Sequence, residues 1–131
     1  MAHNFLLAHA KVSKIYKDDF AGDDGMIGIA NCGDFRYPKS SSSERDQKAA
    51  KRAMLFQWGW FVEPLVFGSY SVVMREILGD RLPHFTIAEQ DELRGSADFL
   101  GLNYYSSFLA STPKQDATYG GYWADIQVDF R

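Results

Sequence analysis

Two short apolar runs, at 26–31 and 97–103, set the hydrophobic pattern of this chain. Such a run of about four to eight residues, bounded by glycine and polar residues, is typical of a strand buried on both faces, as in parallel sheets covered by helices. Gly28, inside the first run, indicates that another part of the chain approaches the backbone closely. We therefore expect two neighbouring parallel strands, joined by helices in a right-handed crossover.

The segment 3–17 is predicted to form an amphipathic helix, because its apolar and basic positions recur at helical spacing on opposite sides. The apolar positions are Phe5, Ala8, Val12 and Ile15, and the basic ones are Lys11, Lys14 and Lys17. The apolar set is expected to pack against the rest of the protein.

A longer helix is predicted to begin at Ser43, where Asp46 three residues on forms a variant of the capping box. Small and apolar positions follow at helical spacing: Ala49, Ala50, Ala53, Phe56, Trp60 and Phe61. Trp58, Trp60 and Phe61 could offer a stacking platform for a sugar, but their helical spacing favours core packing. We expect Pro64 and Gly68 to break this helix.

Two shorter helices and an irregular tail are expected after it. The first covers 72–78 and stops at Gly79, and the second opens with the capping box of Thr86 and Glu89 and closes at Gly95. The tail at 106–131 is interpreted as a loop followed by one weak strand, because Trp123, Ile126 and Val128 alternate with polar residues. No second domain is indicated.

The second apolar run ends in polar residues, Asn103 followed by Tyr104 and Tyr105. In barrels of alternating strands and helices, active sites are built at the C-terminal ends of the strands. Asn103 and Tyr105, one pleat apart, are expected on the same strand face and are candidate site residues. The alternative is that the tyrosines only cap the core, since tyrosine often bridges an apolar interior and water.

Charge and composition exclude some functions. The net charge of −3 gives no basic footprint for nucleic acid. No run of about eighteen apolar residues suggests a membrane span, and the N-terminus lacks the pattern of a signal peptide. A cytoplasmic location is the default expectation, and the location of a longer parent protein stays open.

Metal and thiol chemistry are not expected. His3 and His9 lie six positions apart, which does not match the i, i+4 spacing of a helical metal motif, and His84 stands alone. Cys32 is the single cysteine, so an internal disulfide is excluded and a structural zinc site is not indicated. We expect no metal and no organic cofactor.

Several segments of the chain resemble glycoside hydrolase family 1, the β-glucosidase family. They are AHNFLLAHA at 2–10, IGIANCGDFRYP at 27–38, RAMLFQWGWFVEPLVFGSY at 52–70, GDRLPHFT at 79–86 and SADFLGLNYYSS at 96–107, in the family's order. The resemblance implies a retaining β-glycosidase on an α/β fold, the (β/α)8 TIM barrel. Residues 1–131 would be an internal fragment of that single domain, from about the fourth helix to just past the sixth strand.

The resemblance also implies which site residues are present. Family members use an acid/base glutamate in an Asn-Glu-Pro motif and a nucleophilic glutamate in a Glu-Asn-Gly motif, and neither motif occurs here. Val62-Glu63-Pro64 imitates the first, but its aromatic and apolar neighbours favour a structural role. Tyr105 would donate a hydrogen bond to the nucleophile, and Asn103 would join the polar network around it. Asn31 or Cys32, with the register between them left open, would contact the leaving-group side of the substrate.

The function that we expect is therefore that of a β-glucosidase-like hydrolase acting on β-glucosides, present here as a fragment that is inactive alone. Retaining hydrolysis needs two carboxyl groups about 5 Å apart, which this chain would not supply. One alternative is an inactive carbohydrate-binding or regulatory partial barrel, and another is a truncated gene product with no independent role. Two barrel strands leave unpaired edges, so the isolated chain is also expected to self-associate.

Overall fold

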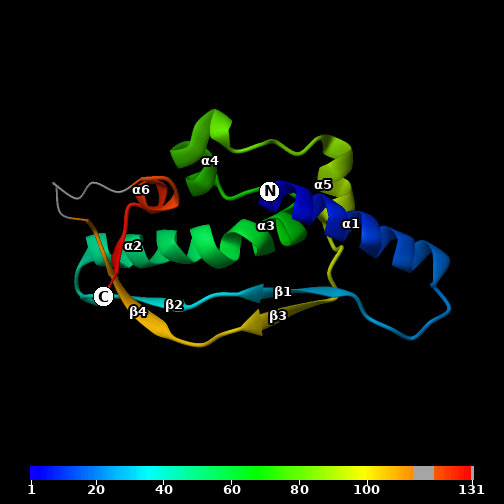
Figure 1. Cartoon of the computed structure of the whole chain (residues 1–131), viewed down its shortest axis with the longest axis horizontal. Coiled ribbons are helices and arrows are strands. Elements are labelled where there is room, and N and C mark those ends of the chain that lie inside the picture. The colour runs from blue at the N-terminus through cyan, green and yellow to red at the C-terminus, as the bar shows by residue number, and fades with distance from the viewer. Residues whose placement is uncertain (114–119, 131) are drawn as a thin grey trace.

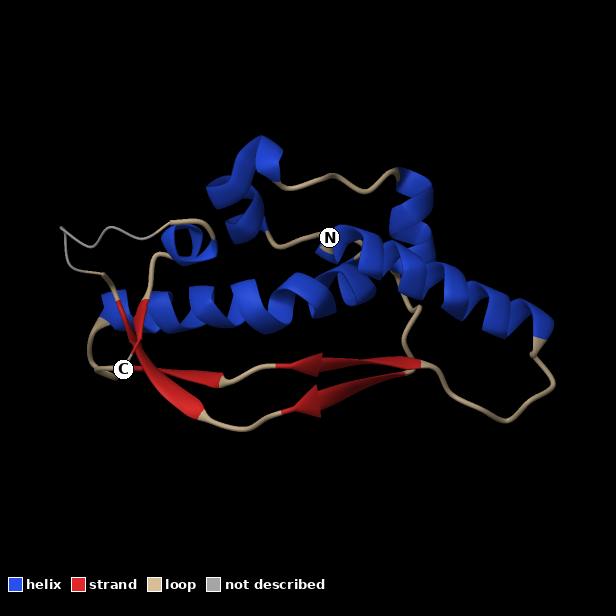
Figure 2. Cartoon of the chain, in the orientation of Figure 1, coloured by secondary structure: helices blue, strands red, loops and turns tan. Residues whose placement is uncertain are grey.

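Helices lie on one side of a layer of strands in the computed structural model, which describes residues 1–113 and 120–130 (Figure 1). Figure 2 shows the same arrangement by element type, with the longest run of helix alongside the strands. The C-terminal ends of the strands at 28–32 and 99–103, where candidate site residues were expected, lie beside the middle of that helical run, since Gly33 and Asp34 contact its Trp58.

The two apolar runs form the expected parallel pair. β1 (Gly28–Cys32) and β3 (Phe99–Asn103) are hydrogen-bonded neighbours, and the chain between them forms helices. The prediction of parallel strands at 26–31 and 97–103 is confirmed, although each strand begins two residues later than expected.

A second small sheet was not predicted. β2 (Phe35–Pro38) pairs in parallel with β4 (Ser107–Ser111), and β4 pairs in antiparallel with β5 (Asp129–Phe130). β2 and β4 continue the directions of β1 and β3 after short breaks (Figure 1). Their sequences mix arginine, proline and serine with aromatic residues, so no continuous apolar run marks them.

The prediction of a loop followed by one weak strand at 106–131 is therefore wrong for the described residues of this segment. The expected loop contains β4, Trp123 and Ile126 lie in a short helix, α6 (Tyr122–Ile126), and the expected weak strand is reduced to Asp129–Phe130. A three-residue spacing of apolar side chains fits a helical turn, and Gln127, at φ 50°, ends that turn. Residues 114–119 and 131 of the predicted tail lie outside the described residues.

The long helix begins where the sequence predicted. α2 (Glu44–Met54) starts after Ser43, whose hydroxyl accepts a 3.2 Å hydrogen bond from the Asp46 N–H. The Asp46 carboxylate in turn accepts from the Ser40 N–H at 3.2 Å, so the reciprocal bond reaches back beyond the cap residue. The helix continues through a π-helical turn, η1 (Leu55–Gly59), into α3 (Trp60–Phe67).

Pro64 does not break this helix, contrary to the prediction. It lies inside α3 and is fully buried, so packing offsets the hydrogen bond that proline cannot donate. Gly68 ends the helix at φ 74°, and a Cβ there would lie 2.8 Å from the Gln90 carbonyl oxygen.

The remaining helices agree with their sequence signals. α4 (Val72–Leu78) is capped by Ser71 and is followed by a 3-10 turn, η2 (Gly79–Arg81). α5 (Ile87–Leu93) opens with the complete capping box of Thr86 and Glu89. The hydrogen bond from the Thr86 N–H holds the pKa of Glu89 below its usual value.

α1 (Ala2–Asp19) forms as predicted but packs through a different side. Its buried residues are Leu6, Ala10 and Ser13, whereas Phe5, Val12 and Ile15 are 61%, 56% and 55% exposed. Two apolar stripes compete along this helix, and the one carrying small side chains packs against α3 and α5. The expected inner face is therefore an exposed apolar face.

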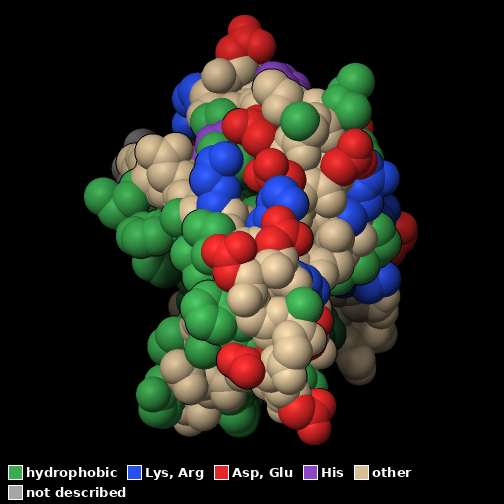
Figure 3. All heavy atoms as spheres, turned by 90° about the vertical axis from the view of Figure 1, so that its right-hand side faces the viewer, with side chains coloured by type: hydrophobic (Ala, Val, Ile, Leu, Met, Phe, Trp, Pro, Cys, Tyr) green, Lys and Arg blue, Asp and Glu red, His purple; other side chains and the backbone are tan. Residues whose placement is uncertain are grey.

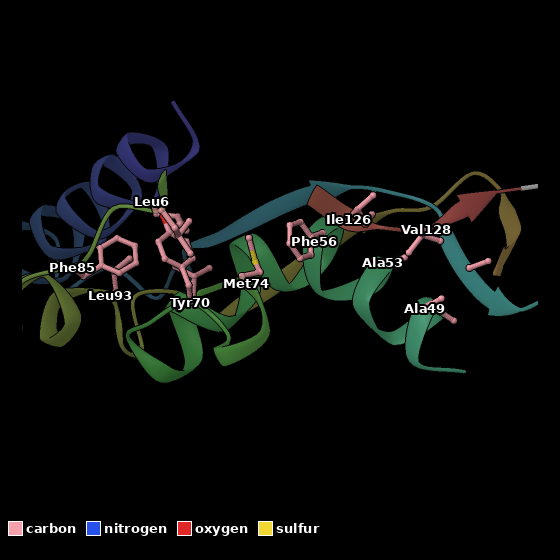
Figure 4. Packing of buried hydrophobic residues seen from close by; sticks show 14 of the residues in the cluster. Leu6, Ala49, Ala53, Phe56, Tyr70, Met74, Phe85, Leu93, Ile126 and Val128 are labelled. Carbon is pink, nitrogen blue, oxygen red and sulfur yellow. The ribbon is translucent and has the colours of Figure 1, made fainter. Parts of the chain in front are cut away.

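The core runs along the helices and not between two covered faces of a sheet (Figure 4). Leu6, Tyr70, Phe85 and Leu93 gather at one end, and Phe56, Ala53, Ile126 and Val128 continue it along α2. The expectation that β1 and β3 are buried on both faces is wrong for this chain, since Leu102 is 63% exposed. Among the described residues, no further strand flanks the pair.

Candidate functional site

The C-terminal ends of β1 and β3 bring two of the predicted site residues together. The strands pair Ala30 with Gly101 and Cys32 with Asn103, and partners in a parallel pair point to the same face. Cys32 and Asn103 are both exposed. We call this the open face, made by Gly28, Ala30, Cys32, Phe99, Gly101 and Asn103.

Asn31 points to the opposite face. Its register partner is Leu102, and Ile29, two residues earlier on the same face, packs against the helical core. Asn31 is only 9% exposed, and its Nδ2 finds no hydrogen-bond partner among the described residues. Of the two candidates that the sequence left open, Cys32 lies with Asn103 and Asn31 does not.

The register of these strands is fixed at their N-terminal ends. The Asp98 N–H donates to the Ile27 carbonyl at 2.7 Å, and the Asp98 carboxylate accepts from the Ile27 N–H at 3.0 Å. Lys17 adds an ion pair at 3.0 Å to the same carboxylate. The hydrogen bond from Ile27, followed by Lys17, lowers the pKa of Asp98. A one-residue slip would turn every side chain to the other face, so this anchor positions the open face.

A buried serine also anchors the helix layer to the start of β3. The Ser13 hydroxyl on α1 donates a 2.6 Å hydrogen bond to the Ser96 carbonyl oxygen. Ser13 is 1% exposed, so little water competes for this bond.

Tyr105 lies just beyond the strand and not on it. β3 ends at Asn103, and the residues at 104–106 lead to β4. The Tyr105 side chain is 78% exposed, and its hydroxyl has no hydrogen-bond partner among the described residues. The neighbouring Tyr104 hydroxyl, by contrast, lies 2.6 Å from the Ser107 hydroxyl. Tyr105 therefore presents a free phenol at the end of the pair.

Asp34 holds the segment that carries Tyr105, a role that the sequence did not reveal. Its carboxylate accepts a 2.6 Å hydrogen bond from the Ser106 hydroxyl and lies 3.5 Å from the Arg36 guanidinium. Its carbonyl oxygen accepts from the Trp58 indole N–H at 3.2 Å. One residue thus ties the ends of both strands to the long helix. Its only sequence signal is an acidic residue just after a predicted strand.

Arg36 turns away from the open face into the second sheet. Its guanidinium lies over the Phe108 ring at 4.8 Å and over the Phe130 ring at 4.5 Å, a cation–π arrangement that joins β2, β4 and β5.

Glu63 lies on the helix side of the sheet, away from Cys32 and Asn103. It lines an apolar hollow of about 870 Å³ together with Leu100 and Leu102, whose side chains face the helices. Burial raises the pKa of Glu63, and the charge of Arg75 opposes that shift. Because the sheet separates it from the open face, this position favours the structural role that the sequence indicated.

Of Trp58, Trp60 and Phe61, the three aromatic residues considered for sugar stacking, two pack against the core. Trp60 and Phe61 pack against the core, with Trp60 stacked on Tyr122 at 6.4 Å between ring centroids. This confirms core packing for both. Trp58 instead lines the apolar hollow.

His3 and His9 are partly buried on α1. His3 lies 3.0 Å from the Tyr70 hydroxyl and stacks on Phe85 at 4.3 Å, and burial lowers the pKa of His3 and of His9. Burial raises the pKa of Tyr70 to about 12. Residues 1–113 and 120–130 contain no group of three His, Cys, Asp or Glu side chains that could hold a metal ion.

The end of the molecule formed by α1 and α5 carries interspersed acidic and basic side chains, with hydrophobic side chains along one side (Figure 3). Within the described residues, none of the helices has both the length and the apolar character needed to cross a membrane.

Comparison with known proteins indicates the family of this chain. The Glycosyl hydrolase family 1 profile matches residues 1–127. Beta-glucosidase 24 of Oryza sativa subsp. japonica is 46% identical over 118 residues, which are 89% of this chain and 23% of that protein. Avenacosidase 1 of Avena sativa is 46% identical over 84% of this chain and 19% of its own length.

Solved structures of known proteins superpose on nearly the whole chain. A rice β-glucosidase in a covalent complex with Glc superposes with a TM-score of 0.92 at 35% identity, over 98% of this chain and 28% of that one. The β-glucosidase of Trichoderma harzianum superposes with a TM-score of 0.87 at 42% identity, over 98% of this chain and 27% of that one. The chain thus spans about a quarter of the length of the relatives it matches, and its α/β fold corresponds to part of their barrel. This chain belongs to glycosyl hydrolase family 1, the family of the β-glucosidases.

Proposed function

We propose that this chain is one segment of a β-glucosidase barrel and that the open face, with Tyr105 beyond it, is a wall of the active site. The observation that carries the proposal is the pairing of Cys32 with Asn103 at the C-terminal ends of two parallel strands. Active sites of this class of barrel lie at those strand ends. In this proposal α1 is the fourth helix of the barrel, and β1 and β3 are its fifth and sixth strands.

Tyr105 is proposed as a positioning residue for the nucleophilic carboxylate. A phenol that donates to a carboxylate stabilises its ionised form, lowers its pKa and fixes its orientation. The exposed hydroxyl of Tyr105 has no hydrogen-bond partner within the described part of the chain and is available for this, whereas that of Tyr104 lies 2.6 Å from the Ser107 hydroxyl.

Asn103 would extend the polar network around the reacting sugar, and Cys32 would face the leaving-group side of the substrate. The register favours Cys32 over Asn31 for this second role, because Asn31 points toward the helices.

The substrate class proposed is β-glucosides, cleaved through a covalent glycosyl-enzyme. The names of the relatives support the class, and the covalent complex of the rice enzyme with Glc supports the intermediate. Both reacting carboxylates would come from polypeptide outside this chain, whose sequence holds neither the Asn-Glu-Pro nor the Glu-Asn-Gly motif. The mechanism requires no cofactor.

The chain by itself is proposed to be inactive. Positioned acid/base groups contribute about 10²- to 10⁴-fold to such reactions, and Tyr105 and Asn103 cannot replace them. Self-association is part of the same proposal, because β1 and β3 each have one edge without a strand partner among the described residues.

The test is an assay of the purified chain with an activated aryl β-glucoside, beside its Glu63→Gln variant. We expect no turnover above the buffer rate from either protein. Turnover that Glu63→Gln abolishes would make Glu63 catalytic and refute the proposal. Turnover that survives Glu63→Gln would show another catalytic group in the chain and refute it equally. Saturable sugar binding without turnover would favour the carbohydrate-binding alternative.

A further inference from the structure

The chain passes from the sheet of β1 and β3 to the sheet of β2 and β4 through two short connections that lie side by side (Figure 1). Two residues, 33–34, connect β1 to β2, and three residues, 104–106, connect β3 to β4. We call these residues the joint. Its longer side carries Tyr105, so the shape of the joint decides where this phenol lies.

The longer side of the joint contains one residue more than the shorter side. Cys32 pairs with Asn103 before the joint and Phe35 pairs with Ser107 after it, so the register shifts by one residue. An extra residue in one of two paired strands is a β-bulge. Bulges are common beside active sites, where they re-aim a side chain. The bulge therefore sets the direction of the residues that it contains.

Main-chain hydrogen bonds close the joint at both ends. The Gly33 N–H donates to the Asn103 carbonyl oxygen at 3.0 Å, and the Phe35 N–H donates to the Ser106 carbonyl oxygen at 3.0 Å. Tyr105 lies between these two bonds. The ends of its segment are thus fixed, and the direction of the phenol depends on how the extra residue is held between them.

Asp34 holds the bulged side through its carboxylate. One carboxylate oxygen accepts the 2.6 Å hydrogen bond from the hydroxyl of Ser106, the residue that directly follows Tyr105. The guanidinium of Arg36 lies 3.5 Å from the other oxygen. Hydrogen bonds to an ionised group are roughly twice as strong as those between neutral groups. Removing this acceptor would therefore loosen the bulge at the position next to Tyr105.

The long helix fixes the shorter side of the joint. The Trp58 indole N–H donates to the Asp34 carbonyl oxygen at 3.2 Å, and a Cβ on Gly33 would lie 2.9 Å from Gln57 Nε2 and from Trp58 Cε2. Both helix residues belong to the π-helical turn η1, and such turns are frequent at functional sites. Asp34 therefore holds Ser106 from a backbone that is itself held in place.

We propose that Asp34 is a positioning residue for catalysis, which closes the bulge through Ser106 and so sets the direction in which Tyr105 presents its hydroxyl to the nucleophilic carboxylate. The inference rests on the proposed function, since the nucleophile belongs to polypeptide outside this chain. A hydrogen bond weakens steeply when its angle falls below about 120°, so a turned phenol would cease to serve the nucleophile as a donor.

The test uses the rice β-glucosidase with its matched segment replaced by this chain, and records kcat, KM and the pH profile with an aryl β-glucoside. Asp34→Ala should lower kcat by about tenfold, less than the loss of the Tyr105 hydroxyl itself, and should leave KM within about twofold. Its acid limb should move to higher pH, because the nucleophile loses its donor. Asp34→Asn should keep more than half of kcat, since its amide oxygen can still accept from Ser106.

Double variants show whether the effect passes through Ser106 and Tyr105. Ser106→Ala should reproduce the changes in kcat and in the acid limb, and it carries the same test if Asp34→Ala fails to fold. Adding Asp34→Ala to Ser106→Ala, or to Tyr105→Phe, should lower kcat by less than about twofold more, because interactions within one network are not additive.

Glu89→Ala is the matched control. The Glu89 carboxylate also accepts from a hydroxyl, that of Thr86 at 3.0 Å, but it does so at the start of α5. This variant should leave kcat and the acid limb in place. Hydrogen exchange of the isolated chain measures the anchor without catalysis: Asp34→Ala should speed exchange of the Phe35 N–H by about tenfold, and Asp34→Asn should leave it unchanged.

Four results would overturn the inference. They are an Asp34→Ala variant with the kcat and pH profile of Glu89→Ala, fully additive losses in the double variants, a raised KM with an unmoved acid limb, and an unchanged exchange rate at Phe35. The third would show that Asp34 contacts the substrate. A folded parent chimera without activity would refute the proposed function and this inference together, whereas an active parent with any of the four results would refute the inference alone.

Discussion

Replacing Gly28 by alanine should destabilise the pairing on which the open face depends. A Cβ at this position would lie 2.3 Å from the Phe99 carbonyl oxygen and 2.8 Å from two atoms of the Phe99 ring. The carbonyl belongs to the partner strand, so it can retreat only if the strands separate. We expect the free energy of unfolding to fall by about 1–3 kcal/mol, the usual cost of overpacking. The midpoint of thermal unfolding should fall by roughly 4 °C for each kcal/mol in a chain of this size.

Two other glycines provide graded controls. A Cβ at Gly101 would meet the Ala30 Cβ at 3.1 Å, a contact that a small shift relieves, and a Cβ at Gly22 would meet nothing within 4 Å. Gly101→Ala should cost less than about 1 kcal/mol, and Gly22→Ala should stay within about 0.5 kcal/mol of the parent chain. Urea unfolding followed by tryptophan fluorescence at low protein concentration measures all three. If Gly28→Ala unfolds with the same free energy as Gly22→Ala, the close approach of β1 and β3 is refuted.

Three further predictions concern polar and exposed groups. Burial lowers the pKa of His3 and His9, so the folded state binds protons less readily than the unfolded chain. The free energy of unfolding should therefore be highest above about pH 6.5, the pKa of histidine in the unfolded chain, and should fall as the pH drops through the lowered pKa values of the folded state. His9→Gln should flatten this slope between about pH 7 and 5 in urea titrations, and an unchanged slope would count against it. Asn31→Leu should raise the free energy of unfolding by about 1 kcal/mol, because Nδ2 is buried without a partner among the described residues; a less stable variant in urea unfolding would show that the amide is satisfied. Light scattering of the isolated chain should show a mass that grows with concentration, and a stable monomer at micromolar concentration would contradict self-association.

The sequence predicted the elements that are stabilised by interactions between residues close together in the chain. The caps at Ser43 and Thr86 form because their side chains reach N–H groups within a few residues. The close approach at Gly28 could be predicted too, because a glycine inside an apolar run commonly marks a place where another backbone comes near.

Features that depend on distant neighbours could not be predicted in the same way. Phe5 and Val12 form as good an apolar stripe as Leu6 and Ala10, and only contacts with α3 and α5 decide between them. The choice between Asn31 and Cys32 required the register with β3, because one residue reverses the face. Asp34 acts through Ser106, a residue 72 positions away.

The most direct test of whether this chain forms a wall of a β-glucosidase active site is a kinetic measurement. The segment of the rice β-glucosidase that this chain matches would be replaced by this chain, and kcat and its pH profile would be recorded with an aryl β-glucoside. We expect the chimera to hydrolyse the substrate. Tyr105→Phe should lower kcat by about 10- to 100-fold, the worth of one hydrogen bond to a charged group. Losing that donor raises the pKa of the nucleophile, so the acid limb of the profile should move to higher pH.

Tyr104→Phe is the matched control in the same chimera, because its hydroxyl is paired with Ser107. It should leave both kcat and the acid limb in place. A folded chimera without activity, or a Tyr105→Phe variant with the kcat and pH profile of the parent chimera, would contradict the claim that this chain forms a wall of a β-glucosidase active site.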